Sequence, residues 1–331
     1  MELQRVGEAD LAEVSAFLCS TFGLTEPTRN FQLDVLRWKY LAPHPYWDGS
    51  RSYCLRVKGR IAAHGCVVPS RLLVGDRSIR SCGVIDWASS PKVVGAGTLI
   101  YQLLYPETEV FLAIGGSQSA REIIPNLGFV SMGDLNIFTR VVRPVQDFRK
   151  RPLLNWRSSA HLARNTIRLV QRRGALVPAG WSARRVHRFD KQTVFPQPGE
   201  TGTVVSQHSP ELLNYLLACP AAQVEGYAFY SGGSVMGYCL LSWREGRCHI
   251  AHVESGNLTG AYALALQLAT RPQGVSEVIA TASTPSIRSA LTAAGFCRRE
   301  AVPVLARDPQ GFLCGLRELS ITSLEDDYFY R

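Results

Sequence analysis

The chain has 331 residues, of which 46% are hydrophobic and 19% charged, with a net charge of +9. This length and composition predict a globular protein with two domains of ordinary size. The most apolar window, residues 261–269, is far too short to cross a membrane, and the N-terminus has no apolar run, so we expect a cytoplasmic protein without a membrane segment.

The first half begins with two amphipathic helices, at residues 10–22 and 31–41. Period-two alternation then predicts four consecutive strands, separated by turn signals at Lys58-Gly59, Pro69-Ser70 and Gly75-Asp76. These strands are residues 52–57, 61–68, 71–79 and 82–87. A helix at 94–104, a strand at 110–114, a helix at 119–126 and a strand at 129–142 complete this half.

The second half repeats this order of elements. A helix is predicted at 210–218, three strands at 226–230, 235–243 and 248–254, a helix at 258–269, a strand at 277–281, a helix at 286–294 and a strand from Phe296 onward. The segment LGFVSMG at 127–133 is echoed by AGFCRRE at 294–300, each after a helix. The order and the echo predict a duplicated α/β domain, at 1–143 and 201–331, joined by a linker at 144–200.

The linker region is strongly basic. Between Arg143 and Lys191 lie thirteen Lys or Arg residues but only two acids, Asp147 and Asp190, so this segment carries +11 and the rest of the chain 9 − 11 = −2. A basic helix is expected at 156–173. Such a block is either a solvated connector or a footprint for an anion such as nucleotide phosphate or RNA.

The stretch from Cys82 to Leu104 reads as a strand, a short polar turn and a helix start. A strand that runs through a glycine-bearing turn into a helix directs unpaired backbone N–H groups and the positive end of the helix dipole at one point, where anionic oxygens bind. Gly95 and Gly97 remove side chains at that turn. The pattern is not a P-loop, because no GKS or GKT follows.

This turn resembles the pyrophosphate loop of the GNAT family of acyltransferases. The family pattern is Arg or Gln, two residues, Gly, any residue, then Gly or Ala, and here it is Lys92, Val93, Val94, Gly95, Ala96, Gly97. The acid before the turn and the later Gly128-Phe129 are similar as well. The resemblance implies two tandem GNAT-like domains, each a mixed, mainly antiparallel sheet flanked by helices. It also implies acetyl-CoA or another acyl-CoA as co-substrate, bound by residues at the end of the strand and in the turn: Trp87, Ala88, Lys92, Val93, Val94, Gly95, Ala96, Gly97 and Thr98.

The implied reaction is direct attack of an amine on the thioester in a ternary complex. A protonated amine needs a base, and Asp86 at the end of the strand is the candidate, although a turn-capping role suits it equally. Backbone N–H groups near Trp87 and Ala88 would stabilise the tetrahedral oxygen. Many members of the family protonate the leaving thiolate with a tyrosine, and the corresponding residue here is Ile124. Ser117, Ser119, a water or an unprotonated thiolate would have to serve instead.

The corresponding join in the second half carries Glu254 in the place of Asp86. Its glycines, Gly256 and Gly260, lack a preceding basic or glutamine residue at the family's spacing. We therefore expect a degenerate copy that helps to build the acceptor cleft. If the second half were the active one, Glu254 would be its base.

Other chemistry is disfavoured by the pattern of residues. Nine scattered cysteines without a CxxC pair indicate reduced thiols, with neither a disulfide framework nor a zinc site. His249 and His252 are three apart on a predicted strand and face opposite ways, so no metal site is expected. Cys82 has no identifiable base, and His64 with Cys66 suits a core pair. The aromatic residues Trp38, Tyr40, Tyr46 and Trp47 are expected to pack in the core, with substrate stacking as the alternative.

The leading interpretation is an acyl-CoA-dependent N-acyltransferase, most simply an acetyltransferase, that acts on a small amine such as an amino sugar or sugar nucleotide. An aminoacyl-tRNA-dependent peptidyl transferase is the second, with the basic segment from Arg143 to Lys191 as its RNA footprint. The third is a non-catalytic ligand-binding protein. We expect a monomer or homodimer and no membrane partner.

Overall fold

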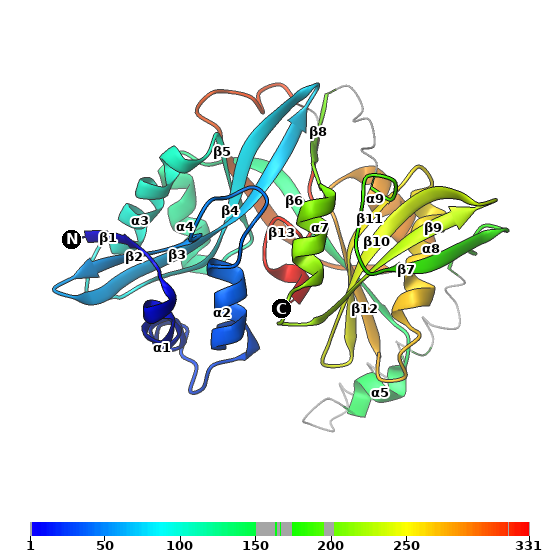
Figure 1. Ribbon diagram of the computed structural model, residues 1–331, viewed down its shortest axis with the longest axis horizontal. Helices are drawn as coiled ribbons and strands as arrows, with labels where there is room; N and C mark the ends of the chain where they lie inside the picture. Colours follow the sequence, from blue (N-terminus) through cyan, green and yellow to red (C-terminus); the bar gives the residue numbers. More distant parts are fainter. Residues whose placement is uncertain are drawn as a thin grey trace.

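The computed structural model describes residues 2–149, 163, 166, 174–194, 202–316 and 318–330. Within them, fourteen strands form a single twisted sheet with helices on both faces (Figure 1). No helix of this described part is long and apolar enough to cross a membrane. The basic helix expected at 156–173 lies outside the described residues, except for 163 and 166.

The elements of the first half follow the predicted order, except that the strand at Glu2–Arg5 was not predicted and three strands, not four, lie between Ser52 and Ser89. They are β1 (Glu2–Arg5), α1 (Leu11–Thr21), α2 (Leu33–Tyr40), β2 (Ser52–Val57), β3 (Arg60–Val74), β4 (Arg77–Ser89), α3 (Ala96–Leu104), β5 (Val110–Ile114), α4 (Gln118–Ile123), β6 (Val130–Val141) and α5 (Pro144–Arg149). Short 3-10 turns η1 (Glu8–Asp10), η2 (Arg29–Phe31), η3 (Tyr105–Glu107) and η4 (Ile124–Leu127) join or extend them.

The prediction of a turn at Pro69-Ser70 was wrong, and β3 runs straight through it. β3 pairs with β4 without a shift of register from Cys66 to Val74, and Pro69 lies opposite Cys82. On the other edge of β3, the pairing with β2 ends at Cys66 and the pairing with β8 begins only at Leu72. Pro69 therefore sits where no strand pairs with that edge, so its missing N–H costs no ladder hydrogen bond.

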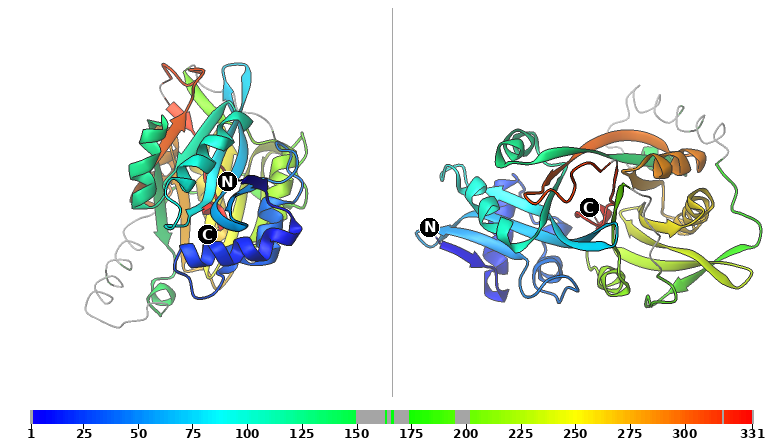
Figure 2. Two further views of the ribbon diagram at one scale, coloured as in Figure 1. Left: turned by 90° about the vertical axis from the view of Figure 1, so that its left-hand side faces the viewer. Right: turned by 90° about the horizontal axis from the view of Figure 1, so that it is seen from above.

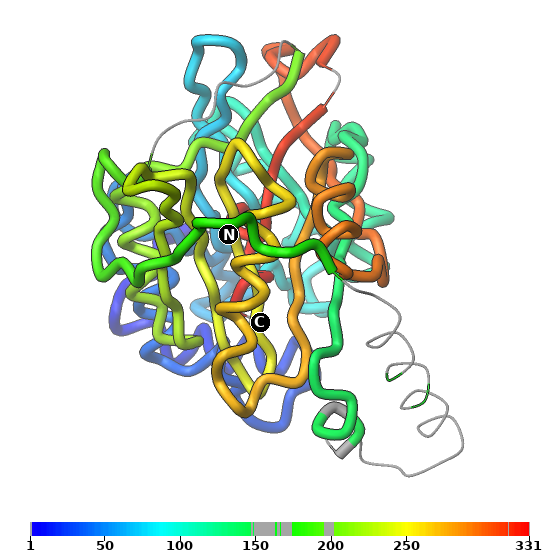
Figure 3. Tube along the Cα trace, turned by 90° about the vertical axis from the view of Figure 1, so that its right-hand side faces the viewer, coloured from blue at the N-terminus to red at the C-terminus, as the bar shows by residue number. Residues whose placement is uncertain are grey.

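The second half contains β7 (Trp181–Val186), β8 (Thr203–Ser206), α7 (Pro210–Leu217), β9 (Gln223–Ser231), β10 (Ser234–Arg244), β11 (Arg247–Ser255), α8 (Leu258–Ala269), β12 (Glu277–Ala282), α9 (Pro285–Ala293), β13 (Cys297–Arg307), β14 (Glu318–Ser320) and η5 (Tyr328–Tyr330). Figure 3 views this half from its own side. The strands β7 and β8 were not predicted. β7 lies within the expected linker and pairs with β9, at the edge of the sheet.

The two halves exchange strands. The order along the sheet is β1-β2-β3-β4-β5-β13-β6-β12-β11-β10-β9-β7, and only β4/β5, β11/β12 and β8/β14 pair in parallel. β13, from the second half, lies between β5 and β6, while β6 pairs with β12. The sheets of the halves are therefore continuous, and each half completes the other.

Helices cover both faces of the sheet in each half (Figures 1 and 2). In the first half, Tyr53 and Leu55 of β2 pack with α3, whereas Cys54, between them, packs with α1 and α2. This is the alternation that one strand imposes on its two faces. In the second half, α8 and α9 cover one face, and α7 covers the other. Trp38 of α2 stacks on Tyr215 of α7, with ring centroids 4.8 Å apart, and joins the halves.

Candidate functional site

Strands β4 and β5 part in the middle of the first half. Their pairing covers only Ser81 to Gly83 on β4 and Val110 to Leu112 on β5. β4 continues to Ser89 and β5 to Ile114 without pairing further with each other, while the other edge of β5 pairs with β13 from Phe111 to Ile114. The structure thus shows a diverging pair of strands, with the opening beyond Gly83.

A β-bulge shapes β4 beside this opening. His64 pairs with Ala88 and Cys66 with Ile85, so β4 carries one residue more than β3 between these pairs. Asp86 lies in the bulge with a positive φ of 51°. A bulge leaves its extra residue out of the ladder and redirects its neighbours. The backbone near Trp87 is therefore free of the regular pairing, as an oxyanion donor would need to be.

The turn between β4 and α3 has an open helix start. Gly95 is the N-cap, at φ 79°, and no side chain caps the helix. Lys92 and Val94 are exposed, Val94 to 96%. The Ala96 N–H donates to the Val93 carbonyl oxygen over 3.3 Å. No capping side chain of the described residues competes for the amides that follow it, which suits an anionic ligand.

Glycine at position 97 is needed for the packing of α3 on β4, besides leaving the turn without a side chain as predicted. A Cβ at this position would lie 2.9 Å from Ser89 Oγ, so glycine allows α3 to approach β4 closely. The Trp87 indole Nε1 donates to the carbonyl oxygen of Gly97 over 3.0 Å and ties the strand to the helix. The turn is therefore held rigidly at both ends.

Asp86 is deeply buried and engaged. Its Oδ2 lies 2.5 Å from Lys39 Nζ, both side chains being at most 3% exposed, and accepts a hydrogen bond of 2.7 Å from the Tyr40 hydroxyl. Burial by itself would raise the pKa of Asp86, but the Lys39 ammonium outweighs it and holds that pKa below its usual value. This environment favours the structural role for Asp86, and its role as a base stays a prediction.

The neighbouring thiol and imidazole groups behave as core residues. His64 Nδ1 lies 2.8 Å from the Asp86 carbonyl oxygen, and Nε2 lies 2.7 Å from Ser52 Oγ. Burial lowers the pKa of His64 to about 4. Cys66 and Cys82 are fully buried, and burial raises the pKa of both thiols. A thiol that stays protonated is a poor nucleophile.

Ser117 and Glu254 each have a local partner. Ser117 is the N-cap of α4, where its Oγ accepts a hydrogen bond from the Ala120 N–H. Ile124, at the position of the absent tyrosine, is buried. Glu254 lies near the end of β11, with its Oε2 3.5 Å from His252 Nε2. The catalytic roles of Ser117 and Glu254 remain predictions, and capping is the function that the structure supports for Ser117.

The corresponding helix start in the second half is closed. Asn257 caps α8, its Oδ1 accepting a hydrogen bond of 3.0 Å from the Gly260 N–H. Pro178 packs on the same turn, so closely that a Cβ at Gly260 would lie 2.6 Å from its Cγ. An anion would find these amides satisfied or covered.

The opening between β11 and β12 is also filled. Their pairing ends at Ile250 and Ala280, and the chain from Ile321 to Ser323 lies beyond it. Ser283 Oγ accepts from the Ile321 N–H over 3.0 Å and donates to its carbonyl oxygen over 2.9 Å. Ser323 Oγ donates to the Ala251 carbonyl oxygen over 3.2 Å. The C-terminal segment thus bridges the diverging strands of the second half.

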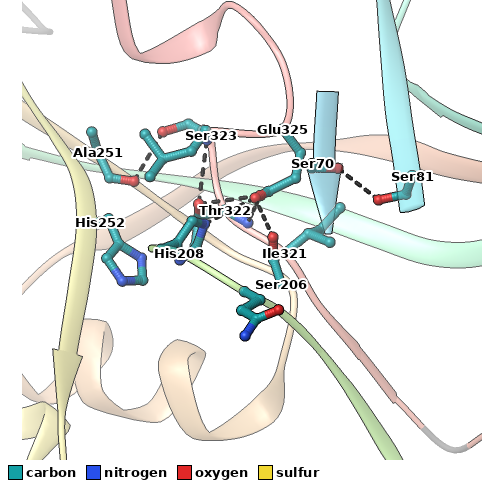
Figure 4. Close-up of polar contacts among 12 residues, drawn as sticks. Ser70, Ser81, Ser206, His208, Ala251, His252, Ile321, Thr322, Ser323 and Glu325 are labelled. Atoms are coloured by element: carbon teal, nitrogen blue, oxygen red, sulfur yellow. Dashed lines mark hydrogen bonds and ion pairs between the residues drawn. The ribbon is translucent and has the colours of Figure 1, made fainter. Parts of the chain in front are cut away.

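Sequence reasoning missed a buried polar cluster at the junction of the halves (Figure 4). It consists of Ser206, His208, His252 and Glu325. Its only sequence signal is the closing LEDDYFY, in which three acids are flanked by apolar residues. All three, Glu325, Asp326 and Asp327, are buried. In the described residues, no group of three or more His, Cys, Asp or Glu is arranged to hold a metal ion.

Comparison with known proteins finds relatives by structure alone. No protein-family model matches the sequence, and no curated protein matches it. A probable N-acyltransferase from Enterococcus faecalis matches over 94% of this chain and 74% of that chain, with 14% identity and a TM-score of 0.55.

Two further structures match at a TM-score of 0.57. A GCN5-related N-acetyltransferase from Anabaena variabilis covers 93% of this chain and 72% of its own, at 8% identity. N-myristoyltransferase from Saccharomyces cerevisiae, solved with bound myristoyl-CoA, covers 93% of this chain and 78% of its own, at 11% identity. With the repeated order of elements and the exchanged strands, these matches show that the chain has the GNAT fold, in two tandem copies.

Proposed function

We propose that this protein is an acyl-CoA-dependent N-acyltransferase whose first half binds coenzyme A. The observation that carries the proposal is the uncapped start of α3 beside the opening between β4 and β5, a combination that the second half has closed. The structural relatives include enzymes named for acetyl and myristoyl transfer, which supports the reaction class but leaves the acyl group open.

In this proposal, each part of the first half has a separate task. The amides at the start of α3 and the exposed Lys92 bind the pyrophosphate oxygens. The pantetheine arm lies between β4 and β5, so that its thioester reaches the junction of the halves. The bulged backbone near Trp87 donates to the thioester oxygen as negative charge develops on it.

The charges buried at the junction support an amine as acceptor. The described residues buried there include four acids, Asp86, Glu325, Asp326 and Asp327, two cationic side chains, Lys39 and Arg51, and the imidazoles of His208 and His252. An excess of carboxylates favours a cationic ligand, and a primary amine is protonated near neutral pH. We therefore propose a small primary amine as acceptor, an amino sugar being one example.

Isothermal titration calorimetry with acetyl-CoA and myristoyl-CoA tests the proposal. Wild type should bind at least one of them, and Gly97→Glu should weaken that binding at least 100-fold, because its side chain forces the start of α3 away from Ser89 and adds a negative charge there. Lys92→Glu, at an exposed position, should weaken it about tenfold without a packing change. The matched control is Gly256→Glu in the second half, where a Cβ meets no atom within 4 Å. Wild type that binds neither thioester, or equal loss in Gly256→Glu, contradicts the proposal.

A further inference from the structure

Glu325 lies where β4 and β5 separate. Gly83 is the last β4 residue paired with β5, and a Cβ on it would overlap the carbonyl oxygen of Glu325. The C-terminal segment therefore passes directly over the opening in the first half. Figure 4 shows the side chain of Glu325 between the strands that carry Ser70 and Ser81 and the two histidines, His208 and His252.

Glu325 holds His208 in one orientation. Its Oε1 lies 3.0 Å from His208 Nε2 and also accepts a hydrogen bond from Ser206 Oγ. Its Oε2 accepts from the Thr322 N–H over 2.6 Å. Burial alone would raise the pKa of Glu325, but these bonds, that of His208 first, keep it below its usual value. A carboxylate here binds the proton of Nε2, which leaves Nδ1 of His208 as the proton acceptor of the ring.

His252 extends the arrangement outward. Its ring lies against that of His208, with centroids 4.3 Å apart, and is 5% exposed. Among the described residues, neither of its nitrogens has a hydrogen-bond partner, although Nε2 lies 3.5 Å from Glu254 Oε2. Burial lowers the pKa of His252. A buried imidazole without partners carries a free-energy cost that is hard to explain by packing alone.

We propose that His208, oriented by Glu325, accepts the proton of the acceptor amine and then releases it to solvent on the side of Glu254. The proposal rests on the proposed acyltransferase function and deepens it. It places the proton acceptor on the second half and the C-terminal segment, opposite the coenzyme A site. Asp86 then keeps its structural role beside Lys39.

The proton balance of the reaction requires such an exit. The substrate ammonium loses one proton to become a nucleophile, the nitrogen lone pair forms the C–N bond, and the C–S bond breaks as the tetrahedral intermediate collapses. The nitrogen's second proton is transferred to the leaving thiolate, so the net reaction releases one proton. The side chain of Glu254 is 20% exposed and marks the side of the buried cluster on which that proton can reach solvent.

Three further titratable groups face the imidazole rings of His208 and His252. They are Glu325 from the C-terminal segment, Glu254 from β11 and Tyr238 from β10, whose ring centroid is 5.4 Å from that of His252. The carboxylates favour protonated imidazole, and burial disfavours it. Substitution of any one of these groups should therefore change the pH dependence of the transfer rate.

Release of the coenzyme A thiol from acetyl-CoA tests the proposal, with glucosamine as the probe amine and with water alone. His208→Gln keeps a polar contact to Glu325 but cannot accept a proton. We expect kcat to fall at least 100-fold and its pH dependence to change, while the Kd for acetyl-CoA changes less than twofold. Glu325→Gln should lower kcat less than His208→Gln does, and it should also change the pH dependence of kcat. The matched control is His249→Gln on β11, the strand that carries His252, and its kcat should stay within twofold of wild type.

The outcomes separate the two proposals. A wild type that binds no acetyl-CoA overturns the proposed use of acetyl-CoA and the proton path with it. Binding without thiol release above the buffer rate overturns the proton path alone. So does a His208→Gln protein that binds acetyl-CoA and keeps the rate and pH profile of wild type. Thermal melting of each variant confirms that it is folded.

Discussion

The two halves share one order of elements but treat the same site in opposite ways. In the first half, α3 begins at an uncapped Gly95 and the strands beside it diverge. In the second, Asn257 caps α8, Pro178 covers its first turn, and the C-terminal segment bridges the diverging strands. A duplicated fold can therefore keep one ligand site and close the other with its own residues, and the closing segment carries Glu325 to the open site.

The acids near the ends of β4 and β11, Asp86 and Glu254, also lie in different environments. Asp86 is buried against Lys39, whereas Glu254 is partly exposed beside His252. The same position thus holds a structural ion pair in the first half and a more accessible carboxylate in the second. Changing each of these features separately shows which differences matter for stability and which for binding.

The largest expected effect is that of Lys39→Met. It leaves the Asp86 carboxylate buried without its cation, and we expect a loss of about 3–5 kcal/mol in the free energy of unfolding. Urea denaturation followed by circular dichroism measures it. The double variant Lys39→Met/Asp86→Asn should lose less, because no buried charge is left behind. Glu254→Gln should stay within about 0.5 kcal/mol of wild type, and an equal loss there would contradict the comparison.

Acid should destabilise the first half through His64. Its pKa is about 4 in the folded protein and 6.5 in the unfolded chain, so between these values the unfolded chain binds the additional proton. Stability therefore falls as the pH falls, by about 2.5 kcal/mol between pH 7 and pH 4.5 for this one group. The lowered pKa of Asp86 adds a loss only below its ordinary value of 3.8. Denaturation at both pH values should show a smaller difference in His64→Gln.

Ser283→Ala tests the filled opening of the second half. It removes the hydroxyl that bonds both the N–H and the carbonyl oxygen of Ile321, a fully buried residue. We therefore expect a loss of about 1–3 kcal/mol in unfolding free energy. Hydrogen exchange at the Ile321 amide should accelerate in the same variant. Ser286→Ala, at an exposed position of the neighbouring helix, is the control and should change little. Unchanged exchange at Ile321 would show that Ser283 does not hold the segment.

Local elements were predictable from the sequence, but the features that join distant segments were not. The strand Val110–Ile114 was predicted to the residue, because an apolar run between turn signals is a local pattern. The course of β3 through Pro69 was missed, since it depends on which neighbouring strands end nearby. The contact of His208 with Glu325 joins residues 117 positions apart, and no spacing rule connects them. The glycine turn before α3 could be predicted as an anion site because the backbone amides of such a site come from consecutive residues.

The smallest effect sharpens the comparison most directly. Asn257→Ala removes the cap that distinguishes α8 from α3, and we expect a loss of about 1 kcal/mol in unfolding free energy. Because Pro178 still covers the turn and Ile321 still bridges the strands beside it, the variant should gain no second site for acetyl-CoA. Calorimetry should therefore return the stoichiometry of wild type. A second binding event would show that the Asn257 cap alone keeps the second half closed, and that the packed segments around it do not.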